Sequence, residues 1–341
     1  MFNITSKDID TILHDYSISG KCIALNELQR YQYEKKDPSS KEVRLIIKVK
    51  LDNNREFVIR FKNEKNVTID IVNDQSRFAV LLANNGIETP TVYSSGGQYA
   101  RRYQIGEYDV IVTVENFVTG ELQEINMETA EKTGRLLARM HNIAEAFDFH
   151  VQNKIIFDPL KENDLFSFED FNVNKDYLIT IDKVLYNNIV REHQLLLQQV
   201  QSFENESKYA VQGDISINNL YRTLCGNIGV FDFNLCGDSV LYFDSIMQAI
   251  YIARLMIYPE NLSEKHESII LPAFLKGYHQ ERPFTNKQKE IFTHLYALIS
   301  AFWLFDMKWD KNSIKKADSI DVHKWMTDIY NRITYLHPIS V

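Results

Sequence analysis

The strongest constraint on the fold is a pair of apolar, β-branched stretches with a polar turn between them. Residues 43–51 have the sequence Val-Arg-Leu-Ile-Ile-Lys-Val-Lys-Leu, and residues 56–62 have the sequence Glu-Phe-Val-Ile-Arg-Phe-Lys. The intervening residues 52–54, Asp-Asn-Asn, are typical of a turn. The pattern therefore predicts a β-hairpin. Further strands are expected at 21–33, 91–93 and 108–114.

Most of the remaining chain is expected to be helical. Apolar residues recur at helical spacing over 70–83, and longer helical patterns cover 127–147 and 183–201. Residues 148–180 are aromatic and acidic and are expected to form loops, and 209–243 are expected to form short strands and loops. Nearly everything after that reads as helix. A strand-rich first part followed by a mostly helical second part predicts an α+β fold.

The charge of the chain is unevenly distributed. The 341 residues contain 38 basic and 46 acidic side chains, which gives a net charge of −8. Residues 1–117 contain 16 acidic and 16 basic residues, so the whole excess of −8 lies after residue 117. This balance argues against nucleic acid as the main partner, and an acidic second half favours a cationic or neutral small molecule over an anionic one.

Other features of the sequence point to a cytoplasmic protein. No stretch approaches the about 18 uncharged apolar residues that a membrane-spanning helix needs. The first residues carry acid and have no apolar core of the kind found in signal peptides. The three cysteines, Cys22, Cys225 and Cys236, are widely spaced, which favours a reducing compartment over a disulfide framework or a zinc site.

One stretch carries residues suited to phosphoryl transfer. Residues 211–220 have the sequence Val-Gln-Gly-Asp-Ile-Ser-Ile-Asn-Asn-Leu, which places Asn219 five residues after Asp214. Thirteen residues later, Asp232 lies in the apolar run Val-Phe-Asp-Phe. Transfer from ATP needs a carboxylate that orients the acceptor hydroxyl and takes its proton, and oxygen ligands that hold Mg²⁺ on the phosphates. By contrast, the sequence contains neither the Gly-x-Ser-x-Gly nor the His-Glu-x-x-His motif.

Three other stretches accompany this one in a fixed order. They are Asn-Gly-Ile-Glu-Thr-Pro at 85–90, Val-Glu-Asn-Phe-Val-Thr-Gly at 114–120 and Leu-Leu-Ala-Arg-Met-His at 136–141. Together with the Gly-Asp-x-x-x-x-Asn loop and the Asp-Phe pair, they resemble the aminoglycoside phosphotransferase and choline kinase family, over about residues 20–245. The resemblance implies a two-lobed, protein-kinase-like α+β fold. A β-rich nucleotide-covering lobe would span 1–115, and a helical lobe with the catalytic loop and acceptor site would span 116–341.

The resemblance also implies roles for single residues. Asp214 would be the catalytic base, and Asn219 and Asp232 would be the magnesium ligands. Arg60 matches the position of the family's phosphate-binding lysine and keeps its charge. Lys62 lies on the same face of the strand and is the second candidate for this contact.

Two further segments would complete the nucleotide site. Residues 36–41, Lys-Asp-Pro-Ser-Ser-Lys, are similar to the Ser-Pro-Ser-Lys version of the family's phosphate-covering loop, so Ser39 and Ser40 would contact phosphates. The hinge-like stretch 114–117, which contains Glu115 and Phe117, would offer backbone groups to adenine. The implied ligands are ATP, Mg²⁺ and a small molecule with a hydroxyl group, bound by 148–180 and the helices after 243.

Two residues depart from the family pattern. Gln212 stands where the loop motif usually has histidine, and Gln75 stands where a helix acid usually pairs with the phosphate-binding cation. A neutral glutamine cannot clamp Arg60 as a carboxylate would. The alternative to a kinase is therefore a nucleotide-binding or ligand-binding protein without phosphotransfer activity.

Three other polar residues are candidates for a functional or a structural role. His141 is expected to be a packed helix residue rather than a catalytic base. The acidic residues Asp238 and Asp244 either contact substrate or cap local structure, and the sequence leaves both interpretations open.

Overall fold

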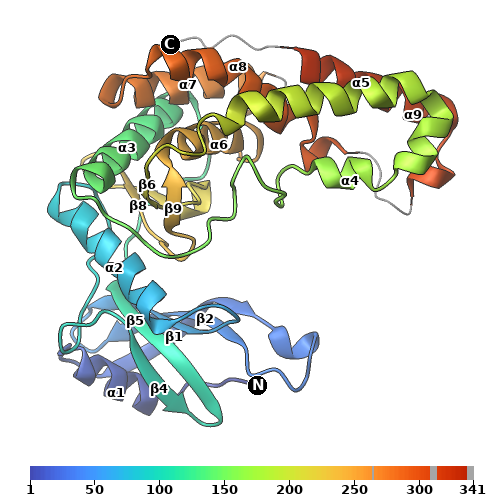
Figure 1. The fold of residues 1–341 in the computed structure, drawn as a ribbon. Coiled ribbons are helices and arrows are strands. Elements are labelled where there is room, and N and C mark those ends of the chain that lie inside the picture. The colour runs from blue at the N-terminus through green and yellow to red at the C-terminus, as the bar shows by residue number, and fades with distance from the viewer. Residues whose placement is uncertain (263–264, 308–312, 336–341) are drawn as a thin grey trace. The chain divides into compact units, whose positions relative to one another are not determined.

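The computed structural model describes residues 1–262, 265–307 and 313–335 (Figure 1). Two compact units share the chain. The first unit comprises Met1–Gln123, Phe149–Asn153 and Ile217–Cys236, and the second comprises Glu124–Asp148, Lys154–Ser216 and the residues from Gly237 onward. One boundary after residue 115 does not describe this division, because the segment that contains Asn219 and Asp232 returns to the first unit.

The first unit is built on a five-stranded antiparallel sheet. Its strand order is β1-β2-β3-β5-β4. The elements of this part are α1 (Ser6–Asp15), β1 (Cys22–Tyr31), the 3₁₀ turn η1 (Tyr33–Lys35), β2 (Val43–Leu51), β3 (Glu56–Asn63), α2 (Ile69–Asn84), β4 (Arg101–Ile105) and β5 (Tyr108–Asn116).

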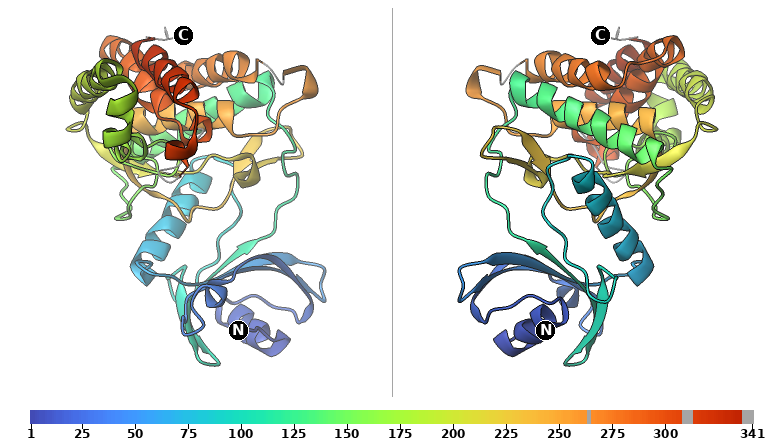
Figure 2. Two further views of the ribbon diagram at one scale, coloured as in Figure 1. Left: turned by 90° about the vertical axis from the view of Figure 1, so that its right-hand side faces the viewer. Right: turned by 90° about the vertical axis from the view of Figure 1, so that its left-hand side faces the viewer.

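One face of this sheet forms the core of the first unit. Alternate residues of the three central strands, such as Leu45, Ile59 and Val112, are buried against α1, which contributes Ile9 and Leu13. Figure 2 shows α1, in dark blue, against this face. The period-2 alternation of the strands places the intervening residues on the opposite face.

The opposite face carries the polar and charged residues of the central strands. Arg60 of β3 pairs in register with Ile46 of β2 and Thr113 of β5, and Val58 pairs with Glu115. Helix α2 packs on this side of the sheet, where Val72 of α2 contacts Ile111 of β5.

A short hairpin completes the first unit. It consists of η2 (Ile217–Asn219), β7 (Leu220–Arg222) and β8 (Ile228–Val230). The amide of Val230 donates to the carbonyl of Glu88 at 2.9 Å, and the amide of Arg222 donates to the carbonyl of Gly120 at 2.6 Å. Gly120 has a φ of +100°, and a Cβ atom there would lie 2.2 Å from the Arg222 carbonyl oxygen, so only glycine fits this approach.

The second unit is mostly helical. Its elements are α3 (Met127–Ala146), α4 (Phe168–Asn172), α5 (Lys175–Gln201), β6 (Lys208–Val211), β9 (Gly237–Val240), α6 (Leu241–Arg254), η3 (Glu260–Leu262), α7 (His266–Glu281), α8 (Asn286–Ala301), η4 (Leu304–Asp306), η5 (Ile314–Lys316) and α9 (Ser319–Thr334). Strands β6 and β9 pair antiparallel, and α5 packs against α8 and α9.

Helices α3 and α7 cross through two glycines. A Cβ atom on Gly134 would lie 2.0 Å from the carbonyl oxygen of Phe274, and one on Gly277 would lie 1.9 Å from that of Glu131. The backbones therefore approach each other more closely than any larger side chain permits.

Most predicted elements are confirmed, with five differences, one of which is helix α4 within the segment 148–180 that was expected to form loops. The prediction of a strand at 91–93 is wrong, because these residues form an isolated bridge between Val92 and Glu115. The helix expected at 183–201 begins at Lys175, although Asp182 interrupts it with non-helical angles. Helix α1 and the polar strand β4 were not predicted. Within the described residues, no helix combines the length and the apolar character needed to cross a membrane.

Candidate functional site

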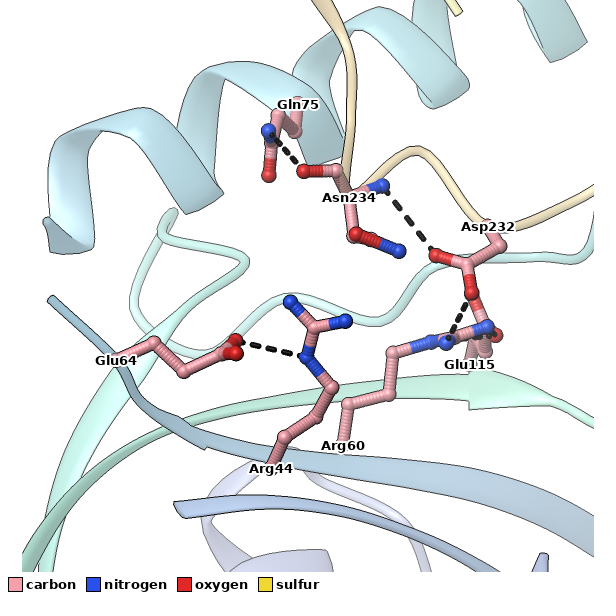
Figure 3. A network of polar contacts seen from close by, with 7 residues as sticks. All are labelled: Arg44, Arg60, Glu64, Gln75, Glu115, Asp232 and Asn234. Carbon is pink, nitrogen blue, oxygen red and sulfur yellow. Dashed lines mark hydrogen bonds and ion pairs between the residues drawn. The ribbon is translucent and has the colours of Figure 1, made fainter. Parts of the chain in front are cut away.

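Arg60 lies at the centre of a network of carboxylates in the first unit. Its Nη2 and Nε donate to Oε1 of Glu115 at 2.9 and 3.2 Å, and its Nη1 donates to Oδ2 of Asp232 at 3.1 Å (Figure 3). The side chain is 9% exposed. Two opposite charges outweigh the effect of burial and hold the pKa of Arg60 above its usual value. The guanidinium group therefore joins β3, β5 and the segment after β8.

Asp232 is held as a carboxylate by this network. Burial alone would raise its pKa, but the charges of Arg60 and Lys62 reverse the effect, and the pKa is lowered. Its Oδ1 accepts from the amide of Asn234 at 3.3 Å. Its φ of 60° is in the left-handed region that non-glycine residues rarely adopt, so the surrounding contacts must hold this conformation.

Asn219 and Asp232 line one cavity of the first unit, here called the Asn219 cavity. It has a volume of about 210 Å³ and is open to solvent. Its walls are mixed: Ile46, Val58, Phe117 and Phe231 are apolar, and Arg60, Glu115, Asn219 and Asp232 are polar. This mixture suits a ligand with a flat apolar part and a charged part. The amide of Phe231 donates to the carbonyl of Asn219 at 3.0 Å, which ties η2 to the segment of Asp232.

A second, smaller cavity of about 40 Å³ meets the first at the carboxylate network. We call it the Lys62 cavity. Arg60, Glu115 and Asp232 line both cavities, and the second also has Lys62, Gln75, Ser76, Thr113 and Asn234 in its wall. The charged network is therefore the common wall of two contiguous spaces.

Gln75 occupies the helix position where an acid was expected, and it hydrogen-bonds to backbone carbonyls rather than to Arg60. Nε2 of Gln75 donates to the carbonyl of Asn234 at 2.9 Å (Figure 3). The same nitrogen donates to the carbonyl of Cys236 at 3.2 Å. The neighbouring acid, Asp74, pairs on the surface with Arg77 at 2.8 Å. Thus α2 holds the segment after Asp232 through an amide, and Glu115 supplies the carboxylate that pairs with Arg60.

The hinge-like stretch uses its amides within the protein. The amide of Phe117 donates to the carbonyl of Glu56 at 3.0 Å, and that of Asn116 donates to the carbonyl of Thr91 at 3.0 Å. These two amides are therefore used within the protein, and the expected contact of adenine with backbone groups of Glu115 and Phe117 stays a prediction. Phe117 lines the Asn219 cavity. The ammonium group of Lys48 lies over the Phe117 ring, 3.7 Å from its centroid.

Ser39 and Ser40 lie away from both cavities just described. The hydroxyl and the amide of Ser39 donate to Oδ1 of Asp37 at 2.7 and 2.9 Å, and the hydroxyl of Ser40 accepts from the amide of Glu42 at 3.1 Å. Both serines shape a turn of their own loop. A phosphate contact by either one stays a prediction.

Asp214 belongs to the second unit, where two glutamines fix the backbone around it. Oε1 of Gln212 accepts from the amide of Asp214 at 2.7 Å, and Oε1 of Gln248 accepts from the amide of Ile215 at 3.0 Å. Both glutamines are buried. Tyr251, on the same face of α6 as Gln248, has its pKa raised to about 12 by burial and by the charge of Asp214.

A buried chain of hydrogen bonds extends from Gln248. Its Nε2 donates to Oδ1 of Asp244 at 3.2 Å, and the other oxygen of Asp244 lies 3.0 Å from Nε2 of His141. The remaining ring nitrogen of His141 lies 2.8 Å from the hydroxyl of Tyr278. His141 is thus a packed helix residue, as expected, and Asp244 has a structural role. Burial lowers the pKa of His141 more strongly than Asp244 raises it.

The candidate metal ligands form a sparse set of oxygen donors. Within the described residues, no three histidine, cysteine, aspartate or glutamate side chains cluster as a ready-made metal site. Asn219 and Asp232 supply an amide and a carboxylate at one cavity, which fits Mg²⁺ because it takes few protein ligands and keeps water and phosphate oxygens as the others.

Comparison with known proteins bears on the fold. No protein-family model and no curated protein matches the sequence. A microcompartment-associated aminopropanol kinase matches in structure with a TM-score of 0.59 and 13% identity, over 96% of this chain and 95% of that chain. Amicoumacin kinase matches with a TM-score of 0.57 and 14% identity, over 87% and 88%. An aminoglycoside phosphotransferase from Alicyclobacillus acidocaldarius matches with a TM-score of 0.51 and 11% identity, over 90% and 92%. The chain has a kinase fold. The predicted α+β, protein-kinase-like fold is confirmed.

Sequence reasoning missed two residues, Glu115 in the first unit and Gln248 in the second. Glu115 was expected to contribute backbone groups, yet its side chain pairs with Arg60. The alternation of β5 contains the signal, because Val110, Val112 and Val114 face the core and Glu115 must face the other way. No comparable pattern in the sequence predicts the contact of Gln248, because its partner is a backbone amide 33 residues earlier in the chain.

Proposed function

We propose that the protein is an ATP-dependent phosphotransferase that acts on a hydroxyl group of a small, cationic or neutral molecule. The observation that carries this proposal is the meeting of Asn219, Asp232 and Arg60 in one cavity on the polar face of the sheet. Oxygen ligands of this kind are what the metal ion of a bound polyphosphate requires, and Arg60 holds Asp232 among them. The apolar walls, with Phe117, suit the base of the nucleotide.

Each residue has one role in this proposal. Asn219 and Asp232 hold Mg²⁺, which when bound neutralises charge on the phosphates. Asp214 orients the acceptor hydroxyl and accepts its proton as the oxygen attacks the terminal phosphorus. The phosphoryl group then leaves ADP and is bonded to the acceptor oxygen. The acceptor site is assigned to the second unit, which contains Asp214.

The solved neighbours support the proposal at the level of ligand class. The amicoumacin kinase structure is a complex with AMP-PNP and Ca²⁺, which are a nucleotide and a divalent cation. An aminopropanol kinase and an aminoglycoside phosphotransferase are named for amine-bearing substrates. A cationic amine also matches the excess of −8 after residue 117.

One experiment tests the proposal and separates it from the alternative. ATP turnover is measured with a panel that contains amino alcohols, aminoglycosides, choline, homoserine and neutral sugars. The kinase proposal expects ADP formation that depends on one acceptor and on Mg²⁺. The alternative, a nucleotide-binding protein without phosphotransfer, rests on Gln212 and Gln75, and it expects ATP binding with no turnover. If millimolar Mg-ATP produces no thermal shift, both are wrong.

A further inference from the structure

Five basic residues lie on the polar face of β2 and β3, and three of them have carboxylate partners. Arg44 pairs with Glu64 at 2.8 Å, and Lys48 pairs with Glu56 at 3.0 Å. Arg60 pairs with both Glu115 and Asp232. For Lys62, no carboxylate of residues 1–262, 265–307 or 313–335 lies within the 4.0 Å of an ion pair. Lys50, the fifth, is only half-buried near the end of β2, so Lys62 differs from the others in being a buried cation without an ion pair to the described carboxylates.

Lys62 is also deeply buried. Its side chain is 8% exposed, and it lines the Lys62 cavity beside Asp232 and Asn234. Burial lowers its pKa to about 8, and the charge of Asp232 only partly offsets this. A buried ammonium without an ion-pair partner is unfavourable for the fold. An anionic ligand that binds beside such a buried cation supplies the missing opposite charge, so this cavity favours anions.

Arg60 is poorly placed to be the main phosphate contact. Its single positive charge faces two carboxylates, so Arg60, Glu115 and Asp232 together carry a charge of −1. A polyphosphate that approached Arg60 alone would meet this negative charge. Its planar fork is occupied on two sides, which suits a group that fixes Asp232 in place.

We propose that Lys62, and not Arg60, is the cation of the sheet that contacts the phosphate chain of the nucleotide. Arg60 is then a positioning residue, which holds Asp232 against β5 through Glu115. The two cavities share the carboxylate network, so a phosphate chain held at Asp232 in the Asn219 cavity extends toward the cavity lined by Lys62. This inference rests on the proposed nucleotide site.

The test compares the affinities of ATP and adenosine, both without Mg²⁺, for the wild type and Lys62→Met. Methionine keeps the length of the side chain and removes the charge. We expect ATP to bind about 10- to 100-fold more weakly to the variant, since one charge-assisted contact is lost, and adenosine to bind within about twofold of the wild type. The unliganded variant is expected to melt at the same or a higher temperature, because an unpaired buried charge is removed.

A control and a comparison variant make the result specific. The control, Lys7→Met, removes the same charge from α1, against the other face of the sheet, and is expected to leave ATP affinity unchanged. The comparison, the double variant Arg60→Gln, Glu115→Gln, removes one charge of each sign from the cavity wall, and we expect it to lose less metal-free ATP affinity than Lys62→Met. If Lys62→Met does not fold, Lys62→Gln takes its place.

The outcomes separate this inference from the proposed function. A wild type that binds neither Mg-ATP, metal-free ATP nor adenosine overturns the nucleotide site, and this inference with it. A wild type that binds ATP, with Lys62→Met binding equally well, overturns the assignment of Lys62 alone. If the double variant instead loses tenfold or more, Arg60 is the phosphate contact.

Discussion

The side-chain oxygen of Gln248 accepts a hydrogen bond from the backbone amide of Ile215 at 3.0 Å, and that of Gln212 accepts from the preceding amide, Asp214, at 2.7 Å. Two consecutive amides of the proposed catalytic loop are thus fixed by two buried glutamines. The replacement of histidine by Gln212 therefore does not leave the loop without an anchor. The glutamine amide supplies the acceptor from within the loop itself.

The first prediction concerns Gln248→Met. This change leaves the amide of Ile215 buried without its acceptor and removes a donor to Asp244, so the free energy of unfolding should fall by about 1–3 kcal/mol. If the loop orients Asp214, kcat should fall about tenfold or more, while the dissociation constant of Mg-ATP stays within about twofold. Turnover and nucleotide titrations measure the two effects separately.

Hydrogen exchange gives an independent readout of this change. The amide of Ile215 should exchange faster in Gln248→Met, whereas amides of β6 should keep their protection. Gln198→Met, on an exposed position of α5, is the matched control and should change neither kcat nor exchange. Unchanged exchange at Ile215 would contradict the role given to Gln248.

The fold could be predicted largely because its strands alternate strongly. In β2 and β3, every second residue is apolar and faces one core, so the hairpin and its register follow from the sequence. Strand β4 escapes this reasoning, because Arg101-Arg102-Tyr103-Gln104 is polar and lies at the edge of the sheet. Helix α1 begins with a recognisable sequence signal, the capping box of Thr5 and Asp8.

The second prediction concerns the crossing of α3 and α7. Gly134→Ala places a methyl group about where the carbonyl oxygen of Phe274 lies, so one helix must shift. Although alanine favours helices, we expect a net loss of about 1–3 kcal/mol or more in the free energy of unfolding, measured by urea denaturation. Lys132→Ala, at a half-buried position of the same helix, should change it by less than about 0.5 kcal/mol. An equally stable Gly134→Ala variant would refute this close approach.

The third prediction concerns pH and His193. The imidazole stacks on Phe168 with ring centroids 3.9 Å apart, and burial lowers its pKa to about 4. In the unfolded chain its pKa is about 6.5, so between these values the unfolded state binds more protons than the folded state. The free energy of unfolding should therefore fall as the pH drops from about 7 to 4, by about 1–3 kcal/mol from this residue.

His193→Phe is the matched variant for this prediction. It keeps an aromatic ring against Phe168 and Phe302 but cannot titrate. Urea denaturation at pH 7, 5.5 and 4 should give a smaller pH dependence for the variant than for the wild type. The wild type keeps a slope of the same sign from His141, whose pKa is also lowered. Identical slopes in the two proteins would show that His193 is not protected from protonation.

The sequence indicates the charged residues of the candidate site but not which of them form ion pairs with one another. The sequence offset from Asp214 to Asn219 and Asp232 is a local signal, and the sheet face of Arg60 and Lys62 follows from strand alternation. Which of these two cations is neutralised depends on Glu115, which is 55 residues distant from Arg60 in the chain. Such a contact is set by sheet register between sequence-distant strands, and local spacing does not contain it.

The fourth prediction distinguishes the roles of Asp214 and Asp232. Asp214→Asn keeps the shape of the side chain and removes the proton acceptor, so kcat should fall by about 10²- to 10⁴-fold while Mg-ATP binding stays within about twofold. Asp232→Asn removes a charged metal ligand and one partner of Arg60, so Mg-ATP should bind at least about tenfold more weakly and turnover should also fall. Asp176→Asn, exposed at the start of α5, is the control and should change neither. Each variant needs one nucleotide titration with and without Mg²⁺ and one turnover assay with the acceptor that the panel identifies. Wild-type turnover in Asp214→Asn would disprove its role as the base, and an unchanged Mg²⁺ dependence in Asp232→Asn would disprove its role as a metal ligand.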